Sequence, residues 1–215
     1  MAYSDACVYP YPAGSTSVRR LALEAKHLGI DRLVCVKSDF TGDFYGVKVV
    51  SGAFIAAENF RNLTSALKKE KNADIIMVKA GDAGFNRSVL NSGRVHILKN
   101  IHLAPKKAFD DVCARSAIKN GIAIDIDISV IIEQRGIIRQ KALTCYGEIL
   151  KFQRKYKFPL TISTGARSYM GLRSVNEITS ICSLFGMSRD EVCEALSSVD
   201  ELLNPKTPVE VLFSV

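Results

Sequence analysis

Patterns typical of β-strands and α-helices alternate along almost the whole chain. Short apolar runs, such as "RLVCVK" at residues 32–37 and "DIIMVK" at residues 74–79, indicate buried strands, whereas residues 15–28 repeat apolar side chains at helical spacing. Further strands are expected at residues 46–55, 94–98, 122–128 and 160–163, and further helices at residues 58–71, 109–120 and 136–157. Strands that are linked through helices by short connections pair in parallel. The alternation therefore predicts an α/β fold.

Two α/β architectures fit this order of elements, a small TIM-like (β/α) barrel and an open doubly wound sheet. We favour the barrel because the alternation continues to the two last helices, which begin at the capping boxes Ser174-x-x-Glu177 and Ser188-x-x-Glu191. An apolar content of 47% supplies a substantial core, and no repeat or linker divides the chain. One domain over residues 1–215 is expected.

The location of the protein follows from the segments that it lacks. No apolar run approaches the roughly 20 residues that cross a bilayer. The start, "MAYSDACVYPYP", has neither a basic region nor an apolar signal core, so a cytoplasmic protein without a membrane partner is expected. The six cysteines never form C-x-x-C, which favours reduced thiols over a metal or redox site.

The net charge of +7 is concentrated in one part of the chain. Between Arg135 and Arg173 there are nine Lys or Arg and one acidic residue, Glu148, which leaves 20 basic and 21 acidic residues elsewhere. An excess confined to one segment predicts a surface that meets a polyanion, with a solvated basic helix face as the alternative.

The stretch "PLTISTGARSYMGLRSVNEI", residues 159–178, joins a predicted strand to a predicted helix. Its Gly-Ala pair leaves the backbone accessible, and the N–H groups at the start of a helix favour an anion. Arg167 and Arg173 add forked donors that match phosphate oxygens. We expect a phosphate-binding loop here, unless both arginines lie in solvent or pair with acids elsewhere.

The predicted helix at residues 136–157 carries much of the positive charge. Its expected core stripe consists of Ile138, Ala142, Cys145, Ile149 and Phe152. Arg135 and Arg139 lie off that stripe at the positive end of the helix dipole, which favours a polyanion contact. Lys151 and Lys155, near the negative end, are equally well explained by the dipole itself.

Hydrolytic chemistry has few candidate residues. His27, His96 and His102 form no H-x-H pair, and converging ligands for zinc or two metal ions are not evident. In "IAIDIDIS" a period of two places Asp125 and Asp127 opposite the isoleucines, hence inside a barrel if the isoleucines face outer helices. The two carboxylates could bind a metal or act as acid and base, but an ion pair with a buried Lys or Arg is favoured.

The second half of the chain resembles a known family. "AFDDVCARSAIKNGIAIDIDIS", the basic helix and "KFPLTISTGARSYMGLRSVNEITSICSLFGMSRDEVCEALS" are similar to ribonuclease P protein component 3, the archaeal relatives of the thirty-kilodalton eukaryotic subunit. The "TGA" loop, the "LRS" before a helix and "GMSRDEVCEALS" carry most of this similarity. "DACVYPYPAGSTSVRRLALEAKHLGI" fits more loosely.

The resemblance implies a barrel of the polymerase and histidinol phosphatase kind without its metal-binding histidines, since Asp5, Ala6 and Cys7 stand in place of H-x-H. It also implies a subunit that binds and stabilises the RNA of ribonuclease P, for removal of 5′ leaders from precursor tRNA. Component 2 and further protein subunits would be its partners. The chain itself would carry no catalytic residue, no metal and no cofactor, because magnesium would lie in the RNA subunit.

Two functional hypotheses follow. In the first, RNA is bound by a set of basic and hydroxyl side chains, namely Arg167, Arg173, Ser168, Arg135, Arg139, Lys155, Lys106 and Lys107. In the second, the chain is a free-standing phosphoesterase that holds a metal with Asp5, Asp125 and Asp127. The missing histidines favour the first.

Overall fold

The computed structural model describes residues 2–38 and 40–204. The last eleven residues of the expected domain therefore lie outside the described part. In the described part, seven strands follow one another as parallel neighbours in the order β1-β2-β4-β5-β6-β7-β8, and β3 pairs antiparallel with β4. The strands are β1 (Ser4–Val8), β2 (Arg32–Val36), β3 (Gly42–Phe44), β4 (Val47–Ile55), β5 (Ile75–Lys79), β6 (Ile97–Lys99), β7 (Ala123–Asp127) and β8 (Leu160–Ser163).

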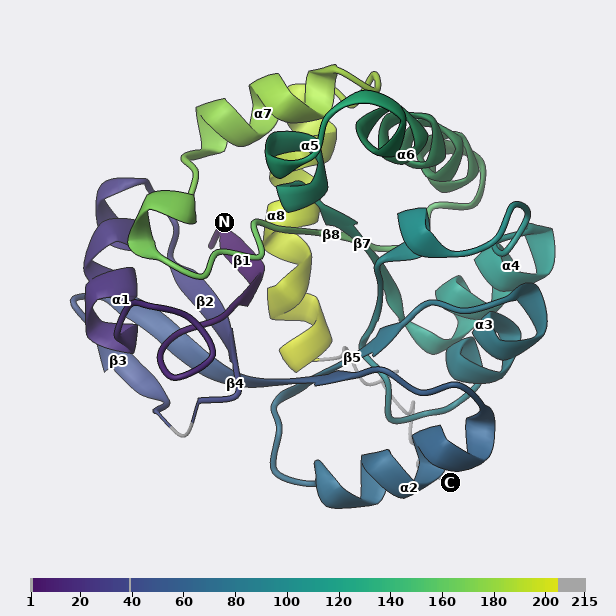
Figure 1. Cartoon of the computed structure of the whole chain (residues 1–215), viewed down its shortest axis with the longest axis horizontal. Helices are drawn as coiled ribbons and strands as arrows, with labels where there is room; N and C mark the ends of the chain where they lie inside the picture. The colour runs from purple at the N-terminus through teal and green to yellow at the C-terminus, as the bar shows by residue number, and fades with distance from the viewer. Residues whose placement is uncertain (1, 39, 205–215) are drawn as a thin grey trace, which may run out of the picture.

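Most of the helices surround the strands on the outside, whereas α8 lies across the middle of the view (Figure 1). They are α1 (Val18–His27), α2 (Phe60–Lys69), α3 (Ala83–Leu90), α4 (Asp111–Asn120), α5 (Ser129–Glu133), α6 (Gly136–Tyr156), α7 (Val175–Ser183) and α8 (Arg189–Leu203), with short 3-10 turns η1 (Ile101–Leu103) and η2 (Tyr169–Gly171). Both predicted capping boxes are present, at the starts of α7 and α8. In the described residues no helix is long and apolar enough to cross a membrane.

The first and last strands close the sheet into a barrel just beyond their carboxyl ends. The Gly165 amide donates to the Cys7 carbonyl oxygen at 3.0 Å, and the Tyr9 amide donates to the Ala166 carbonyl oxygen at 2.8 Å. The loops that follow β1 and β8 consequently lie side by side (Figure 1). The predicted TIM-like barrel is therefore confirmed over the open sheet.

Side chains of β7 alternate between the two faces of the barrel wall, as its sequence predicts. Ile124 and Ile126 pack in the layer that the outer helices cover, whereas Ala123 joins an interior cluster with Met77 of β5. Val199 of α8 belongs to the same interior cluster. Helix α8 therefore supplies part of the barrel core instead of covering only its outside.

The sequence patterns did not predict helices α3 and α5 or the hairpin strand β3. Helix α3 has only eight residues, and its core face includes a fully buried asparagine, Asn86, where an apolar residue would have completed the helical pattern. The Asn86 amide group donates to the carbonyl oxygens of Gly81 and Ala108. Because Asn86 interrupts the apolar pattern on the buried face of α3, the sequence pattern did not indicate this helix.

The predicted core stripe of α6 is wrong at its start. Ile138 is 53% exposed, and the buried part of the helix begins only at Ala142. Tyr146 and Leu150, which were not predicted, are buried together with Ile149. The first turn of α6 therefore lies beyond the elements on which the rest of the helix packs.

Candidate nucleic-acid interface

The carboxyl ends of three neighbouring strands, β6, β7 and β8, form one rim of the barrel. The chain segments that follow these strands carry seven of the eight residues predicted to bind RNA: Lys106 and Lys107 after β6, Arg135 and Arg139 after β7, and Arg167, Ser168 and Arg173 after β8. The eighth, Lys155, lies in the last turn of α6, at the amino end of β8. The fold thus gathers most of the predicted set on one rim.

The loop after β8 differs from the predicted phosphate cradle because the backbone amides of its first three residues are already used. The Thr164 amide donates to Asp5 Oδ1, the Gly165 amide to the Cys7 carbonyl oxygen, and the Ala166 amide to the Thr164 hydroxyl. At the start of α7, the Ser174 amide donates to the Glu177 carboxylate, whose negative charge also offsets the helix dipole. The expectation that the Gly-Ala pair leaves its backbone accessible is therefore wrong, and the side chains of the loop are the better candidates for holding an anion.

Arg167 is exposed but held in place. One guanidinium nitrogen donates to the Ala13 carbonyl oxygen at 2.8 Å, and the guanidinium carbon lies 4.7 Å from the centre of the Tyr9 ring. A guanidinium has five N–H donors, so most of them remain available for a ligand. Stacking on an aromatic ring fixes the plane of the group and lowers the entropy lost on binding.

Arg173 serves the structure of the loop. Its Nη1 donates to the carbonyl oxygens of Met170 and Leu172, both at 2.7 Å, and the side chain is half-buried. This arginine therefore stabilises the turn before α7, and its Nη2 and Nε donors are left for an anion.

The other residues predicted to bind RNA differ in exposure and in whether they already form an ion pair. Arg135, Lys106 and Lys107 are exposed, and Arg139 is half-buried. Lys155 is exposed but lies 3.2 Å from the Asp111 carboxylate and above the ring of Tyr156. An exposed pair of this kind contributes little stability, but it partly neutralises Lys155.

Sequence reasoning missed aromatic residues beside the arginines of this rim. Tyr11 is 71% exposed on the loop after β1, and the guanidinium carbon of Arg20 lies 4.5 Å from the centre of the Tyr169 ring. Because the loops after β1 and β8 are far apart in the sequence, no local pattern brings these groups together.

A buried lysine occupies the interior at the same end of the barrel. The Lys99 ammonium, at the end of β6, lies 2.7 Å from Asp125 and 2.9 Å from Asp127, and it donates to the Ser163 hydroxyl at 2.5 Å. Burial lowers the pKa of Lys99, but the two carboxylates outweigh burial and hold it well above its ordinary value. Burial alone would raise the pKa of Asp127, whereas the Lys99 charge lowers it below its usual range. Both aspartates face inward as predicted, and the expected ion pair with a buried base is confirmed.

The third acid of the phosphoesterase hypothesis, Asp5, has a different role. Its carboxyl group accepts hydrogen bonds from the Thr164 amide, the Thr164 hydroxyl and the Cys7 amide, across the seam between β1 and β8. Burial raises the pKa of Asp5 to about 6, although the hydrogen bonds from Thr164 oppose the rise. Asp5 therefore links β1 to the loop after β8 and helps to close the barrel.

These contacts do not fit a metal centre. Asp125 and Asp127 share the Lys99 ammonium, and Asp5 is saturated by Thr164 and Cys7. Among residues 2–38 and 40–204, no three His, Cys, Asp or Glu side chains are grouped so that they could hold a metal ion. The geometry does not support the free-standing phosphoesterase.

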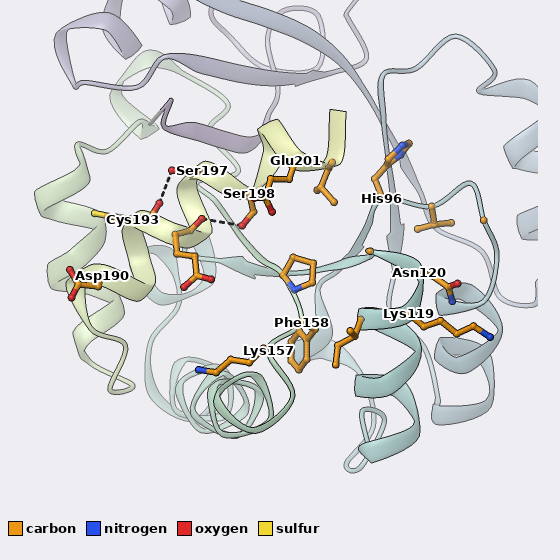
Figure 2. Close-up of a pocket in the computed structure, with 17 residues that line it drawn as sticks. His96, Lys119, Asn120, Lys157, Phe158, Asp190, Cys193, Ser197, Ser198 and Glu201 are labelled. Atoms are coloured by element: carbon orange, nitrogen blue, oxygen red, sulfur yellow. Dashed lines mark hydrogen bonds between the residues drawn. The ribbon is translucent and has the colours of Figure 1, made fainter. Parts of the chain in front are cut away.

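A groove of about 1030 Å³ lies at the opposite end of the barrel (Figure 2). His96, Gly121 and Pro159, which precede β6, β7 and β8, line one side, and α8 lines the other with Asp190, Cys193, Glu194 and Glu201. The hydroxyls of Ser197 and Ser198 donate to carbonyl oxygens of their own helix (Figure 2). Three acidic side chains, those of Asp190, Glu194 and Glu201, outnumber the two lysines of the groove, Lys119 and Lys157, so the groove has no excess of positive charge for a polyanion.

Comparison with known proteins gives one family. The family model described as RNase P subunit p30 matches residues 2–206. Ribonuclease P protein component 3 of Methanococcoides burtonii is 32% identical over 205 residues, which cover 91% of this chain and 84% of that protein. The protein of the same name from Methanothermobacter thermautotrophicus is 30% identical over 195 residues, covering 83% of this chain and 80% of that protein.

Solved structures agree on the fold. A chain in the cryo-EM structure of archaeal ribonuclease P with mature tRNA matches with a TM-score of 0.75 at 20% identity, over 93% of this chain and 89% of that chain. A Xaa-Pro dipeptidase matches with a TM-score of 0.58 at 11% identity, over 94% of this chain and 75% of that chain. At these identities the likeness concerns the fold alone.

Proposed function

The chain belongs to the RNase P subunit p30 family, and from this premise we propose how it serves the enzyme. It is a protein subunit of ribonuclease P, the tRNA-processing endonuclease. In our proposal, the RNA subunit and its magnesium ions remove the 5′ leader from precursor tRNA. This chain binds and stabilises that RNA without a catalytic residue or cofactor of its own.

One observation carries the assignment of the RNA-binding surface, namely the exposed and preorganised guanidinium of Arg167. Its position on the Tyr9 ring and its bond to Ala13 leave outward donors on the rim that also bears Arg135, Lys106 and Lys107. Because the Gly165 and Ala166 amides are used internally, we assign phosphate binding to these side chains. Arg139, Ser168 and Arg173 would have secondary parts, and Lys155 would contribute least because Asp111 holds it.

Salt-dependent RNA binding tests this assignment. We expect Arg167→Ala, in the chain assembled with its partner subunit, to weaken binding across RNA sequences and to lower the log–log salt slope by about 0.7 to 0.9, the value for one lost phosphate contact. Arg167→Lys should keep the slope but lose affinity, since lysine lacks the forked donors.

Arg94→Ala is the matched control. Arg94 is also exposed, but it lies just before β6 at the opposite end of the barrel, so its loss should leave the slope unchanged. Equal slopes for wild type and a folded Arg167→Ala protein would contradict the assignment. Equal effects of the two substitutions would mean that only net charge matters.

Protein subunits of the complex, component 2 first among them, are proposed to bind at the corner between α5 and α6. Ile132, Ile137 and Ile138 are 38%, 74% and 53% exposed there, beside Arg135 and Arg139. Bases gain stacking energy from aromatic rings, not from aliphatic side chains, so the isoleucines favour a protein surface.

Light scattering of the chain co-expressed with component 2 tests the corner. We expect a complex with wild type and a much weaker one with Ile137→Ser. Leu184→Ser, which removes an exposed leucine at the end of α7, should behave as wild type. Unchanged association of Ile137→Ser would place the interface elsewhere.

We also place the complex in the cytoplasm. All six cysteines are free thiols, and four of them are buried. Free thiols in this number are typical of a reducing compartment, which supports this location.

A further inference from the structure

Lys99 lies where α/β barrels usually place their chemistry, at the carboxyl end of an interior strand. The residue is 1% exposed, and the following residue, Asn100, turns the chain away in a left-handed conformation with φ of 59°. A lysine so completely withdrawn from water is costly unless its charge is fully matched.

The ammonium group has a complete set of partners. It has three N–H donors, and three acceptors surround it: Asp125 at 2.7 Å, Asp127 at 2.9 Å and Ser163 at 2.5 Å. These acceptors come from neighbouring strands or their ends, so the sheet itself holds them around one point. The arrangement is an all-oxygen site that contains one cation.

The charges around that point favour a cation of higher charge. Two carboxylates face a single ammonium, which leaves an excess of one negative charge when both are ionised. Hydroxyls of Thr161 and Ser163 donate to Asp125, and the Ser129 hydroxyl donates to Asp127. These neutral donors disperse the excess charge but do not cancel it.

The size of the site also suits a metal ion. Oxygen atoms bind Mg²⁺ or Ca²⁺ at about 2.0 to 2.6 Å. The Asp125 and Asp127 oxygens, 2.7 and 2.9 Å from the Lys99 nitrogen, would each need to move inward by less than about 1 Å to reach these distances.

We propose that Lys99 is a built-in cation, whose ammonium fills a site that Asp125, Asp127 and Ser163 would otherwise offer to a divalent metal ion. The carboxyl end of the barrel is thereby held closed without metal. The inference is independent of the proposed function, because it concerns the folded chain alone.

Lys99→Ala tests the proposal through thermal unfolding followed by circular dichroism, a suitable probe because the chain contains no tryptophan. In EDTA we expect the melting temperature to fall by about 10 °C, because loss of the Lys99 ammonium leaves the buried carboxylates of Asp125 and Asp127 without a counter-charge. Millimolar Mn²⁺ should restore part of that loss, with about one Mn²⁺ bound per chain after gel filtration. Wild type should melt at the same temperature in EDTA and in Mn²⁺.

Lys99→Ala/Asp125→Asn is the matched control. It relieves the repulsion between the two carboxylates, so it should be more stable than Lys99→Ala in EDTA, but it should not respond to Mn²⁺. If Lys99→Ala folds only when Mn²⁺ is present, the proposal is supported.

Three results would overturn the proposal. The first is a folded Lys99→Ala protein that does not respond to Mn²⁺, and the second is a Lys99→Ala protein that fails to fold even with Mn²⁺ while the double variant folds. The third is a wild-type protein whose melting temperature rises in Mn²⁺, when the same rise is absent from an Asp125→Asn variant.

Discussion

Asp5 and Gly14 are two residues on which the seam between β1 and β8 depends. The Asp5 carboxyl group receives three hydrogen bonds across or beside that seam while it is almost fully buried. Gly14 lies so close to the β8 loop that a β-carbon there would stand 2.0 Å from the Tyr9 carbonyl oxygen and 2.4 Å from that of Arg167. A carboxyl group and a missing side chain thus set the spacing of the loops that carry Arg167.

The raised pKa of Asp5 predicts a pH-dependent stability. Because the folded pKa is about 6 and the unfolded value is 3.8, its contribution is fully present below pH 3.8 and is lost as pH rises through 6. Between pH 5 and pH 8, wild type should lose about 1 kcal/mol more of unfolding free energy than Asp5→Asn. Urea denaturation at both pH values measures the difference.

The histidines do not account for a difference in pH dependence between wild type and Asp5→Asn. Burial lowers the pKa of His96 and of His102, so their effect has the opposite sign, and both variants contain them. An Asp5→Asn protein with the same pH profile as wild type would show that Asp5 is ionised throughout this range.

Gly14→Ala should destabilise the protein and disturb Arg167 at the same time. We expect a loss of about 1 to 3 kcal/mol in unfolding free energy, because two backbone oxygens must move to admit the methyl group. Gly93→Ala is the control, since a β-carbon at Gly93 meets nothing within 4 Å. Equal stability of the two variants would mean that the seam accommodates the added methyl group.

Helix α6 combines two parts with different roles. From Ala142 onward its apolar side chains pack on the barrel, whereas Ile137 and Ile138 in its first turn are exposed beside Arg135. A single amphipathic helix therefore serves the core at one end and a surface at the other.

Equivalent substitutions in the two parts of α6 should have unequal effects. Ile149→Ser removes a side chain that is 3% exposed, and it should cost about 3 kcal/mol or more of unfolding free energy. Ile138→Ser should change the same quantity by less than about 0.5 kcal/mol. Urea denaturation of the isolated chain measures both unfolding free energies. Similar losses for Ile149→Ser and Ile138→Ser would show that Ile138 is packed in solution.

At the scale of the whole molecule, the barrel keeps its inward-facing carboxylates and its histidines apart. Within residues 2–38 and 40–204, the interior carboxylates are bound to Lys99 or to Thr164. The three histidines are separated: His27 is exposed on α1, the ring of His96 accepts the Ile76 amide, and His102 bonds to Tyr146.

The purified chain is expected to cleave neither precursor tRNA nor a phosphomonoester at any divalent metal concentration. Cleavage assays with the chain alone, and with the RNA subunit in the presence and absence of the chain, measure this. We expect the chain to enhance cleavage only when the RNA is present. Turnover by the chain alone, abolished by Asp125→Asn, would contradict the expectation.

Features that depend on local periodicity could be predicted from the sequence. Alternating patterns predicted the barrel, period two in "IAIDIDIS" placed Asp125 and Asp127 inside it, and the Ser-x-x-Glu spacings located both capped helices. These predictions succeed because each rests on residues a few positions apart, whose relative directions the backbone fixes.

Contacts between groups that are distant in the sequence became known from the three-dimensional fold alone. Lys99 reaches Asp125 from 26 positions away, and Asp5 takes the Thr164 amide from 159 positions away, so neither pair has a local signal. The same closure uses the Gly165 amide, and Ile138 is exposed because the packing of α6 begins only at Ala142. Partners of this kind depend on strand order and barrel closure, which no short stretch of sequence contains.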